Sequence, residues 1–351
     1  MSGRPDGRQI LRSEVQSSLS RLSQVEGQLS WLSSSIAYID SMCTSLPSRF
    51  EALRKGGFVH RVSVEVQLKK LVDNWNLTRS GITSEIESLT GQLRSEISAL
   101  KVEGNSLLNR INQPFLVEFA IRGEVTLYNS KVNSFVSRAN IQINQAKHGL
   151  GEVKENFEKV EKVVFDAENV LNAISSASFS LQENEHPLLS VKAKKLEPGE
   201  KCEGRIILTD QRLLFEVERE VVLERKLFIA TKTKTERSLE LNVPLGLIAS
   251  AQKGRVGLIA WEGVYIDLRP GYKFKAVVFD TKGDDTEKVV EAINYVLSGQ
   301  ADRDRTVSEA RPAEGLKAFF CIKCGAPLDV PTTRGIYEVE CKYCGTRNRI
   351  K

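Results

Sequence analysis

The stretch LEPGEKCEGRIILTDQRLLFE, from Leu196 to Glu216, decides how the middle of this chain folds. Two short runs of β-type residues, Cys202–Leu208 and Gln211–Val217, are separated by the polar dipeptide Thr209-Asp210. A Pro-Gly pair precedes the first run, and such pairs mark turns. The pattern predicts two short strands, and with them a β-rich domain in the middle of the chain.

The following residues continue this pattern, with Gly, Pro and charged turns between short runs. Six more strands are expected: Val221–Ala230, Ser238–Val243, Leu247–Gln252, Val256–Trp261, Val264–Leu268 and Phe274–Phe279. An amphipathic helix, Glu287–Leu297, comes last. Its apolar face is Val289, Val290, Ile293, Tyr295, Val296 and Leu297. Seven or eight short strands closed by one helix predict a β-barrel or sandwich with the helix at one end.

This region, expected over residues 186–300, resembles GRAM and bacterial PH-like domains. In those domains an L-x-x-G-E turn precedes a strand that reads L-T-x-x-R-L-x-F. The matching residues here are Gly199, Glu200, Leu208, Thr209, Arg212, Leu213 and Phe215. The resemblance covers about a third of the chain. It implies a PH-like β-barrel capped by a C-terminal helix, with a phosphoinositide or a protein as its ligand.

Binding of an anionic lipid headgroup requires basic side chains near the open end of such a barrel. The candidates for this role are Lys192, Lys194, Lys195, Lys201, Arg205, Lys232 and Lys234. The K-x(n)-[K/R]-x-R pattern of phosphoinositide-binding PH domains is absent, because Lys201 is followed by Cys-Glu-Gly-Arg205. Acidic residues are interleaved with the basic ones. A protein ligand, a lipid ligand and a purely architectural role therefore all stay open.

Residues 1–178 have the apolar spacing of long helices. From Val15 to Leu46 the apolar residues step by alternating threes and fours, and only Ser18 interrupts the series. A second series holds the same alternation for six heptads: Val132, Val136, Ala139, Ile143, Ala146, Leu150, Val153, Phe157, Val160, Val164, Ala167, Leu171 and Ile174. A repeat of 3.5 residues favours a coiled coil.

Prolines and glycines divide this region into about three long helices, near 7–46, 60–112 and 116–176. Pro47 is expected to end the first, Gly56-Gly57 is a break, and Gln113-Pro114 is another. Gly149 and Gly151 lie inside the third helix, which is expected to continue through them. The helices either fold back on each other or pair with a second chain, and the sequence leaves both arrangements open.

Four cysteines near the C-terminus form two matched pairs. In the first pair, Cys321 and Cys324, the second cysteine is followed by Gly325, and after sixteen intervening residues comes the second pair, Cys341 and Cys344, whose second cysteine is followed by Gly345. Two CxxCG turns place four thiolates around a single ion, which is the ligand set of a tetrahedral structural zinc site. The sequence therefore predicts one structural Zn²⁺ in a zinc ribbon over residues 316–351, with a strand within Gly335–Glu340.

Other interpretations of the four cysteines are a redox dithiol and a rubredoxin-like iron site. A redox dithiol does not need two matched turns, and iron sites of this kind usually have a longer insert. Four sulfurs leave no open coordination position, so the ion is not expected to catalyse a reaction. Basic residues around the second pair are candidates for nucleic-acid contact: Arg334, Lys342, Arg347, Arg349 and Lys351.

Bulk properties limit the remaining alternatives. Lys and Arg number 50 against 45 Asp and Glu, and a net charge of +5 is too small to indicate nucleic-acid binding by itself. Residues 301–315 are polar and charged, which is typical of a flexible linker. The first residues lack an apolar signal-peptide core, and Cys43 and Cys202 lie far apart. A cytoplasmic protein is expected, with any membrane contact peripheral.

No catalytic motif is found, since GxxxxGK[ST], GxGxxG, HExxH and GxSxG are all absent. The three histidines, His60, His148 and His186, are not expected to bind metal or to catalyse. The predicted fold is a multidomain α+β protein: a coiled coil, a PH-like barrel and a zinc ribbon. The predicted function is a non-enzymatic scaffold or adaptor that self-associates through its coiled coil and presents both modules to protein partners, with a membrane surface as a further candidate. The alternative is a nucleic-acid-associated zinc-ribbon protein.

Overall fold

The computed structural model describes residues 7–113, 118–197, 200–226, 229–256, 261–281, 283–306, 320–328, 334–336 and 338–349. The chain forms two compact units. The first contains Met1–Pro47 and Gln67–Glu161, and the second contains Ser48–Val66 and Lys162–Lys351. Both units include parts of the same long helices.

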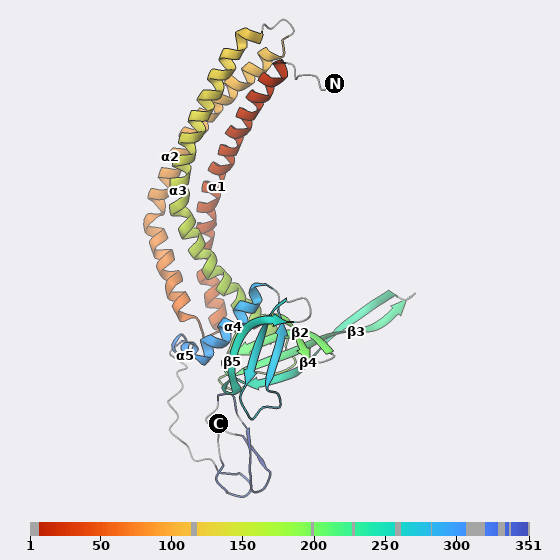
Figure 1. The fold of residues 1–351 in the computed structure, drawn as a ribbon. Coiled ribbons are helices and arrows are strands. Elements are labelled where there is room, and N and C mark those ends of the chain that lie inside the picture. Colours follow the sequence, from red (N-terminus) through yellow and green to blue (C-terminus); the bar gives the residue numbers. More distant parts are fainter. Residues whose placement is uncertain are drawn as a thin grey trace. The chain divides into compact units, whose positions relative to one another are not determined.

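Three long helices dominate the first unit: α1 (Gly7–Lys55), α2 (Val62–Ile111) and α3 (Glu118–Ser175). They run side by side in Figure 1. Ion pairs join them along their length, with Lys101 bound to Glu26 at 2.5 Å and Lys131 bound to Glu103 at 2.8 Å. The helices therefore fold back on one another within one chain, which settles the arrangement that the sequence left open.

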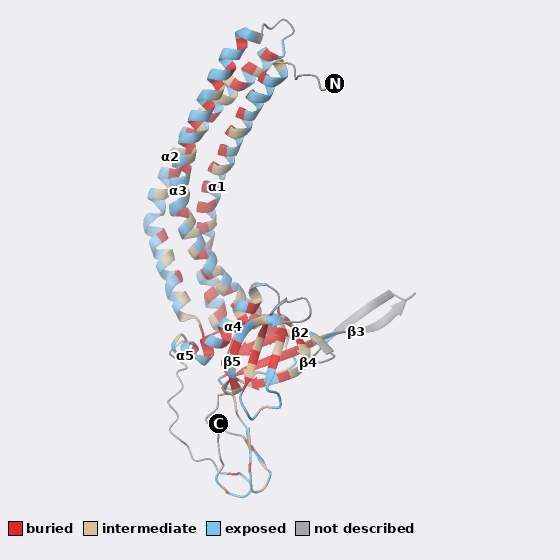
Figure 2. Ribbon diagram, viewed as in Figure 1, coloured by how far each residue is buried: buried red, intermediate tan, exposed pale blue. Residues whose placement is uncertain are grey.

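The apolar series of α1 is buried as the spacing predicts, and each helix in Figure 2 carries a stripe of buried residues. Val15, Leu22, Leu29, Leu32 and Ile39 all have 0% exposure. Ser18, which interrupts the series, is also fully buried, and its hydroxyl donates to Asn129 Oδ1 on α3 at 2.7 Å. In α3, Val132, Ala139, Ile143, Phe157, Val160 and Val164 are at most 1% exposed.

This burial bears on the expected self-association. Within the described residues, the apolar seam that could have paired with a second chain is covered by helices of the same chain, so a coiled coil between two chains is not confirmed. A heptad-like spacing indicates that a helix has one buried stripe, but the spacing is the same whether the stripe is covered by the same chain or by another copy.

Pro47 does not end the first helix, which corrects the predicted boundary. α1 continues for two more turns to Lys55, and its final residues bury Phe50 and Leu53 to 2% and 3% exposure. Proline in a helix interior removes a backbone donor and crowds the preceding turn. Apolar burial beyond it offsets that cost here. The predicted break at Gly56-Gly57 is confirmed, because Gly57 has a φ of +88°.

The second unit contains a seven-stranded antiparallel sheet in the order β4-β3-β2-β1-β7-β6-β5. Its strands are β1 (Pro187–Glu197), β2 (Glu200–Thr209), β3 (Arg212–Lys226), β4 (Ile229–Pro244), β5 (Ile248–Val256), β6 (Trp261–Leu268) and β7 (Ala276–Asp280). No pairing between β4 and β5 closes the sheet among the described residues, so the predicted closed barrel is not confirmed. Helix α4 (Asp284–Leu297) packs on β1, β5 and β6 and buries Val289 and Ile293.

Two predicted strands need correction, and one strand was missed. The run Val221–Ala230 is no separate strand, because it is divided between β3 and β4, whose outer parts pair with each other. The residues of Val256–Trp261 are the end of β5 and the start of β6, and residues 257–260 lie outside the described chain. The sequence missed β1 entirely, although β1 lies between β2 and β7 in the sheet.

The residues that follow α4 are ordered further than expected. Helix α5 (Gln300–Arg303) lies within the predicted linker, and Ala301 in it has 0% exposure. The backbone N–H of Thr306 donates to Val59 O at 3.1 Å. The expected linker of 301–315 is therefore corrected over residues 301–306, and its remainder lies outside the described residues. Within the described chain, no helix is apolar enough over a sufficient length to cross a membrane.

We predict that Pro47→Ala stabilises the protein by about 1–3 kcal/mol, because proline in a helix interior is about 3 kcal/mol less favourable than alanine. The side chain of Pro47 is exposed, so the change costs little packing. Urea unfolding followed by circular dichroism at the helix band measures the gain. The exposed neighbour Ser48→Ala is the control and should change the stability by less than about 0.5 kcal/mol. An unchanged or lower stability of Pro47→Ala would mean that the helix ends where the sequence predicts.

Candidate metal centre and buried polar cluster

Each CxxCG segment forms the same tight turn, called a knuckle here. The N–H of Gly325 donates to Cys321 O, and the N–H of Gly345 donates to Cys341 O, both at 2.9 Å. The two glycines have φ angles of +68° and +67°, a conformation that residues with a Cβ rarely adopt. Strands β8 (Glu338–Glu340) and β9 (Arg347–Arg349) pair on either side of the second knuckle. Both knuckles therefore require a glycine at this position because of its positive φ angle.

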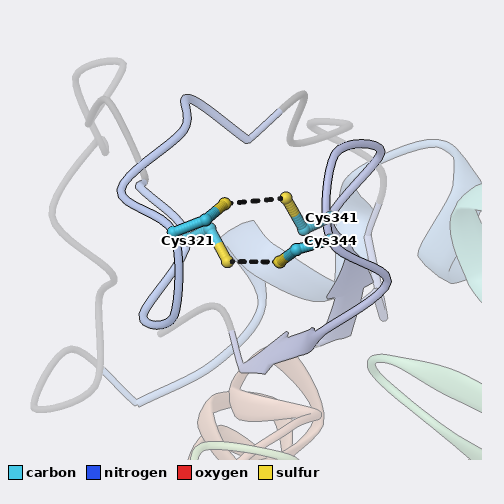
Figure 3. Close-up of side chains that lie close together, drawn as sticks. Cys321, Cys341 and Cys344 are labelled. Atoms are coloured by element: carbon cyan, nitrogen blue, oxygen red, sulfur yellow. Dashed lines mark hydrogen bonds between the residues drawn. The ribbon is translucent and has the colours of Figure 1, made fainter.

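The knuckles bring the four sulfur atoms within 4.8 Å of one another, and they face each other in Figure 3. Cys321 Sγ lies 3.5 Å from Cys344 Sγ, and Cys324 Sγ lies 3.6 Å from Cys341 Sγ. A disulfide requires about 2.05 Å, so these are not disulfide distances. A tetrahedron with metal–sulfur bonds of about 2.3 Å has sulfur–sulfur edges of about 3.8 Å. The four cysteines could therefore hold one metal ion.

Local hydrogen bonds favour thiolates in this cluster. The backbone N–H of Cys324 lowers the pKa of the Cys321 thiol to about 6. The hydroxyl and backbone N–H of Thr346 lower the pKa of Cys344. Although the N–H of Ala326 acts in the opposite sense, hydrogen bonds to Cys344 and Cys321 raise the pKa of Cys324 to about 12. Crowded sulfurs resist complete ionisation alone, and a bound cation removes that resistance.

A buried asparagine that sequence reasoning missed supports the first knuckle from β9. Asn348 is 2% exposed, and its Oδ1 accepts the N–H of Ile322 at 2.8 Å. Its Nδ2 donates to Thr346 O at 2.7 Å. Asn348 therefore joins the backbones of the two knuckles. A polar residue between the outward-facing Arg347 and Arg349 was the available signal, because strand alternation places it on the inner face.

The basic residues assigned to nucleic-acid contact have different surroundings. The guanidinium of Arg334 donates to Asp210 O and binds both carboxylate oxygens of Asp302 at 2.9 Å, so its role in nucleic-acid contact is corrected to a structural one. Arg347 and Arg349 lie opposite Glu340 and Glu338 in the β8–β9 register. Two further candidates complete the set: Lys342 is exposed, and Lys351 lies outside the described residues.

The Thr209–Arg212 segment that resembles the GRAM motif forms a buried turn between β2 and β3. Thr209 Oγ1 accepts the N–H groups of Gln211 at 3.1 Å and Arg212 at 2.8 Å, and donates to Glu185 at 2.7 Å. Arg212 binds both carboxylate oxygens of Glu185, at 2.9 and 2.6 Å. Removing either partner would leave the other charge buried, so the motif residues stabilise the turn.

Asp210, in the same turn, is the centre of a second buried cluster. Its Oδ1 accepts the N–H of His186 at 2.9 Å. Its Oδ2 lies 3.4 Å from His186 Nδ1, 3.8 Å from Arg305 Nη1 and 4.0 Å from His60 Nε2. His60 is fully buried, and its Nδ1 lies 3.2 Å from Ala301 O. No signal in the sequence indicated the burial of His60.

Burial decides the charge of His60. It lowers the pKa of the imidazole to about 4, although the nearby Asp210 carboxylate opposes this. For Asp210, burial acts to raise the pKa, and hydrogen bonds from His186 outweigh it, so the pKa is lowered. Near neutral pH a neutral His60 therefore lies beside an ionised Asp210. A neutral imidazole that donates from Nδ1 to Ala301 O carries no proton at Nε2, the atom nearest to Asp210.

The proposed anion-binding lysines are divided between the two faces of the sheet. Lys195 is 4% exposed and binds Glu240, so its assignment to an anionic ligand is corrected. Lys192 is exposed and lies opposite Arg205 in the β1–β2 register, and Lys194 forms an ion pair with Glu203 beside them. The side chains of Lys201, Lys232 and Lys234 lie outside those that the structure describes.

No protein-family model and no curated protein matches this chain. Among solved structures, the Vps36 N-terminal PH domain is 16% identical, with 34% of this chain and 86% of that chain covered and a TM-score of 0.23. The DH/PH domains of p115-RhoGEF are 10% identical over 80% and 98%, with a TM-score of 0.25. Autoinhibited Vav1 is 11% identical over 99% and 71%, with a TM-score of 0.24. Scores this low support no inference about this chain.

We predict that acid weakens the fold through His60. A histidine whose pKa falls from 6.5 to about 4 on folding contributes its full stability above pH 6.5 and loses it as the pH falls toward 4. The loss should reach about 3 kcal/mol, and Asp210 contributes outside this window, since its pKa lies below the ordinary 3.8.

Urea unfolding of the wild type and of His60→Gln between pH 7.5 and about 4 measures this loss. Gln keeps a donor for Ala301 O and cannot titrate. The difference in stability between the two proteins should shrink as the pH falls, while acid effects elsewhere cancel. A difference that is constant with pH would show that His60 does not titrate on unfolding in this range.

Proposed function

We propose that this protein is a non-enzymatic adaptor whose C-terminal ribbon is ordered by one structural zinc ion. The observation that carries the proposal is the convergence of four sulfurs from two matched knuckles. Zinc bound by Cys321, Cys324, Cys341 and Cys344 would have four ligands and no position for water or substrate. Such an ion supplies folding energy to a segment that is too short to bury a core by itself.

We further propose that residues 186–300 are a PH/GRAM-like module. Seven antiparallel strands followed by α4, together with the buried Thr209–Arg212 turn, support this assignment. The side chains of Thr209 and Arg212 already form hydrogen bonds within that turn. They therefore say little about a ligand, and the ligand has to be inferred from the outer surface of the sheet.

A protein is the better-supported ligand of this module. Of the basic side chains first considered for a lipid headgroup, Lys195 is buried and Lys194 is already paired with a carboxylate. Lys192 and Arg205 lie on one face of the sheet, but two basic side chains alone do not make a phosphate-binding site. Location in the cytoplasm, with any membrane contact peripheral, stays part of the proposal.

The three long helices would act as a rigid element within a single chain. Their apolar stripes are buried intramolecularly, so the adaptor proposed here does not depend on coiled-coil self-association. A groove between α2 and α3 is lined by Ile82, Ile86, Gln92, Gln142 and Leu150, and Glu85 is its one ionisable side chain. A single carboxylate does not supply the paired acid and base that most hydrolytic chemistry uses.

The nucleic-acid alternative receives less support from the observed contacts. Arg334 is bound by acceptors of the sheet unit, and Arg347 and Arg349 have glutamates opposite them. Counter-charges at these positions reduce the attraction for phosphates.

We predict that the zinc-loaded full-length protein does not float with anionic vesicles containing phosphoinositide in near-physiological salt, because Lys195 is buried and Lys194 is paired with Glu203. The fraction of protein that floats with these vesicles is compared with the fraction that floats with neutral vesicles. Charge reversal at Lys192 and Lys194 should change nothing, like the control Lys69→Glu on α2, which is also exposed. Selective flotation that Lys192→Glu abolishes and Lys69→Glu leaves intact would replace the protein ligand by a lipid.

A further inference from the structure

A groove runs between α2 and α3 in the first unit. It contains two hollows of about 530 and 240 Å³, which follow one another along the same two helices. Residues 82–92 and 142–150 line the larger hollow, and residues 71–78 and 152–156 line the smaller one. The two helices run side by side in Figure 1. At about 1.5 Å per residue, residues 71–92 of α2 span about 33 Å, or about six helical turns.

The residues that line the groove include a series at the spacing of helix–helix contacts. On both helices the series steps by alternating fours and threes, the 3.5-residue repeat by which one helix packs along another. A groove with this repeat on both walls is complementary to a further helix lying along it. The series is Leu71, Trp75, Thr78, Ile82, Glu85, Leu89 and Gln92 on α2, and Gln142, Ala146, Gly149, Val153 and Asn156 on α3.

Part of the apolar surface in the groove is left uncovered by this chain. Ile143 and Phe157, in the buried series of α3, have 0% exposure, but the members of the series that line the groove between them are less covered. A helix laid in the groove would remove this surface from water, and burial of apolar surface drives most protein association. The half-buried apolar residues of the groove are Leu71, Ile82 and Leu89 on α2, and Ala146 and Val153 on α3.

Gly149 keeps the α3 wall of the groove open. A Cβ at this position would meet no atom within 4 Å, so no close contact inside the chain requires glycine here. A Cβ at Gly104 on α2, in contrast, would collide with the side chain of Tyr128. Glycine is unfavourable in a helix interior. At position 149 it leaves space in the groove for a side chain of an occupant.

The groove carries negative charge. Glu85 and Glu152 are its ionisable side chains, both are exposed, and neither forms an ion pair with another residue that the structure describes. The complement of the groove is therefore apolar with a basic margin. A second copy of the groove would bring two more carboxylates, which repel the first two. The Lys and Arg side chains of the same stretches contact α1 instead, and they are Arg79, Lys147 and Lys154.

Resting on the adaptor proposal, which leaves the partner open, we propose that this groove docks an amphipathic helix with basic margins from a partner protein. The apolar stripe of that helix would cover Ile82 and Leu89, and one large apolar side chain would enter beside Gly149. Lys or Arg at the margins would face Glu85 and Glu152. A small ligand fits less well, because the larger hollow has no aromatic side chain in its lining.

The probe is a displayed library of helical peptides of about six turns, selected on the zinc-loaded full-length protein. The library has Leu, Ile, Val, Met or Ala at the a and d positions of each heptad, and Lys, Glu, Gln or Ser at the other positions. The selected helices should carry Lys in excess of Glu beside the apolar stripe, because the groove is acidic.

One synthetic peptide from this selection is then titrated against variants of the groove. Gly149→Leu should weaken binding by about tenfold or more, because the new side chain fills the space that the peptide needs. The same change should leave the unfolding temperature unchanged or raise it, since Leu favours a helix more than Gly does. Glu85→Lys and Glu152→Lys should each weaken binding by about threefold and reduce its salt dependence.

The chain provides matched controls on the same two helices. Gly123 of α3 is exposed, and a Cβ at this position also meets no atom within 4 Å. Glu87 of α2 is exposed and is not among the residues that line the groove. Gly123→Leu and Glu87→Lys reproduce both kinds of change outside the groove and should leave the peptide affinity unaltered.

A selection that yields no helix, or an affinity that survives both Gly149→Leu and Glu85→Lys, would overturn the docking site while leaving the adaptor proposal in place. Selected helices with Glu in excess of Lys would overturn the basic partner. A dimer of this protein in sedimentation that Gly149→Leu dissociates would assign the groove to a second copy and contradict the proposal. Failure of the adaptor proposal alone would appear in vesicle flotation, which does not involve the groove.

Discussion

The burial of the Asp210 carboxylate is the constraint on which the second unit depends. A fully buried charge is tolerated only when surrounding groups compensate it, and here His186 and Arg305 do so from two segments distant in sequence, while the neutral His60 packs beside them. The backbone oxygen of the same residue accepts from Arg334. One turn of the sheet thus determines where the α1–α2 connection, the residues after α5 and the segment before the second knuckle lie.

That arrangement gives the ribbon a particular relation to the sheet. Arg334 O accepts the N–H of Gly246, and the side chain of Arg334 binds Asp302, so the chain between the two knuckles is fixed to the sheet at residue 334. A ribbon held in this way and ordered by the proposed metal would have a defined backbone, with Ile322 and Tyr343 exposed at its turns. Binding, rather than bond making, is the chemistry that such a surface provides. The adaptor proposal follows from this combination.

The sequence predicts the parts of the structure that depend on local spacing. The matched CxxCG turns predict the sulfur cluster, and the alternating apolar series predicts the buried stripes of α1 and α3. The sequence does not predict the parts of the structure that depend on contacts between residues far apart in the chain. Lys192 and Lys194 hide the strand pattern of β1 in the sequence, yet Leu189, Val191 and Ala193 alternate with them and are buried. No local signal connects His60 with Asp210, or Arg334 with Asp302, because each pair is joined only by the fold. Pro47 shows the same limit, since burial of Phe50 beyond it carries the helix through.

The central claim is that a closed site of four thiolates orders the ribbon, and X-ray absorption at the zinc edge of the full-length protein tests it most directly. The account predicts one zinc ion per chain with four sulfur neighbours at about 2.3 Å and no nitrogen or oxygen neighbour. The same spectrum is expected from Cys202→Ser, whose sulfur lies in β2. Fewer than four sulfur neighbours, with a nitrogen or oxygen neighbour at about 2.0–2.1 Å, would contradict the claim. A coordination position not filled by cysteine could bind water, and the metal could then take part in catalysis.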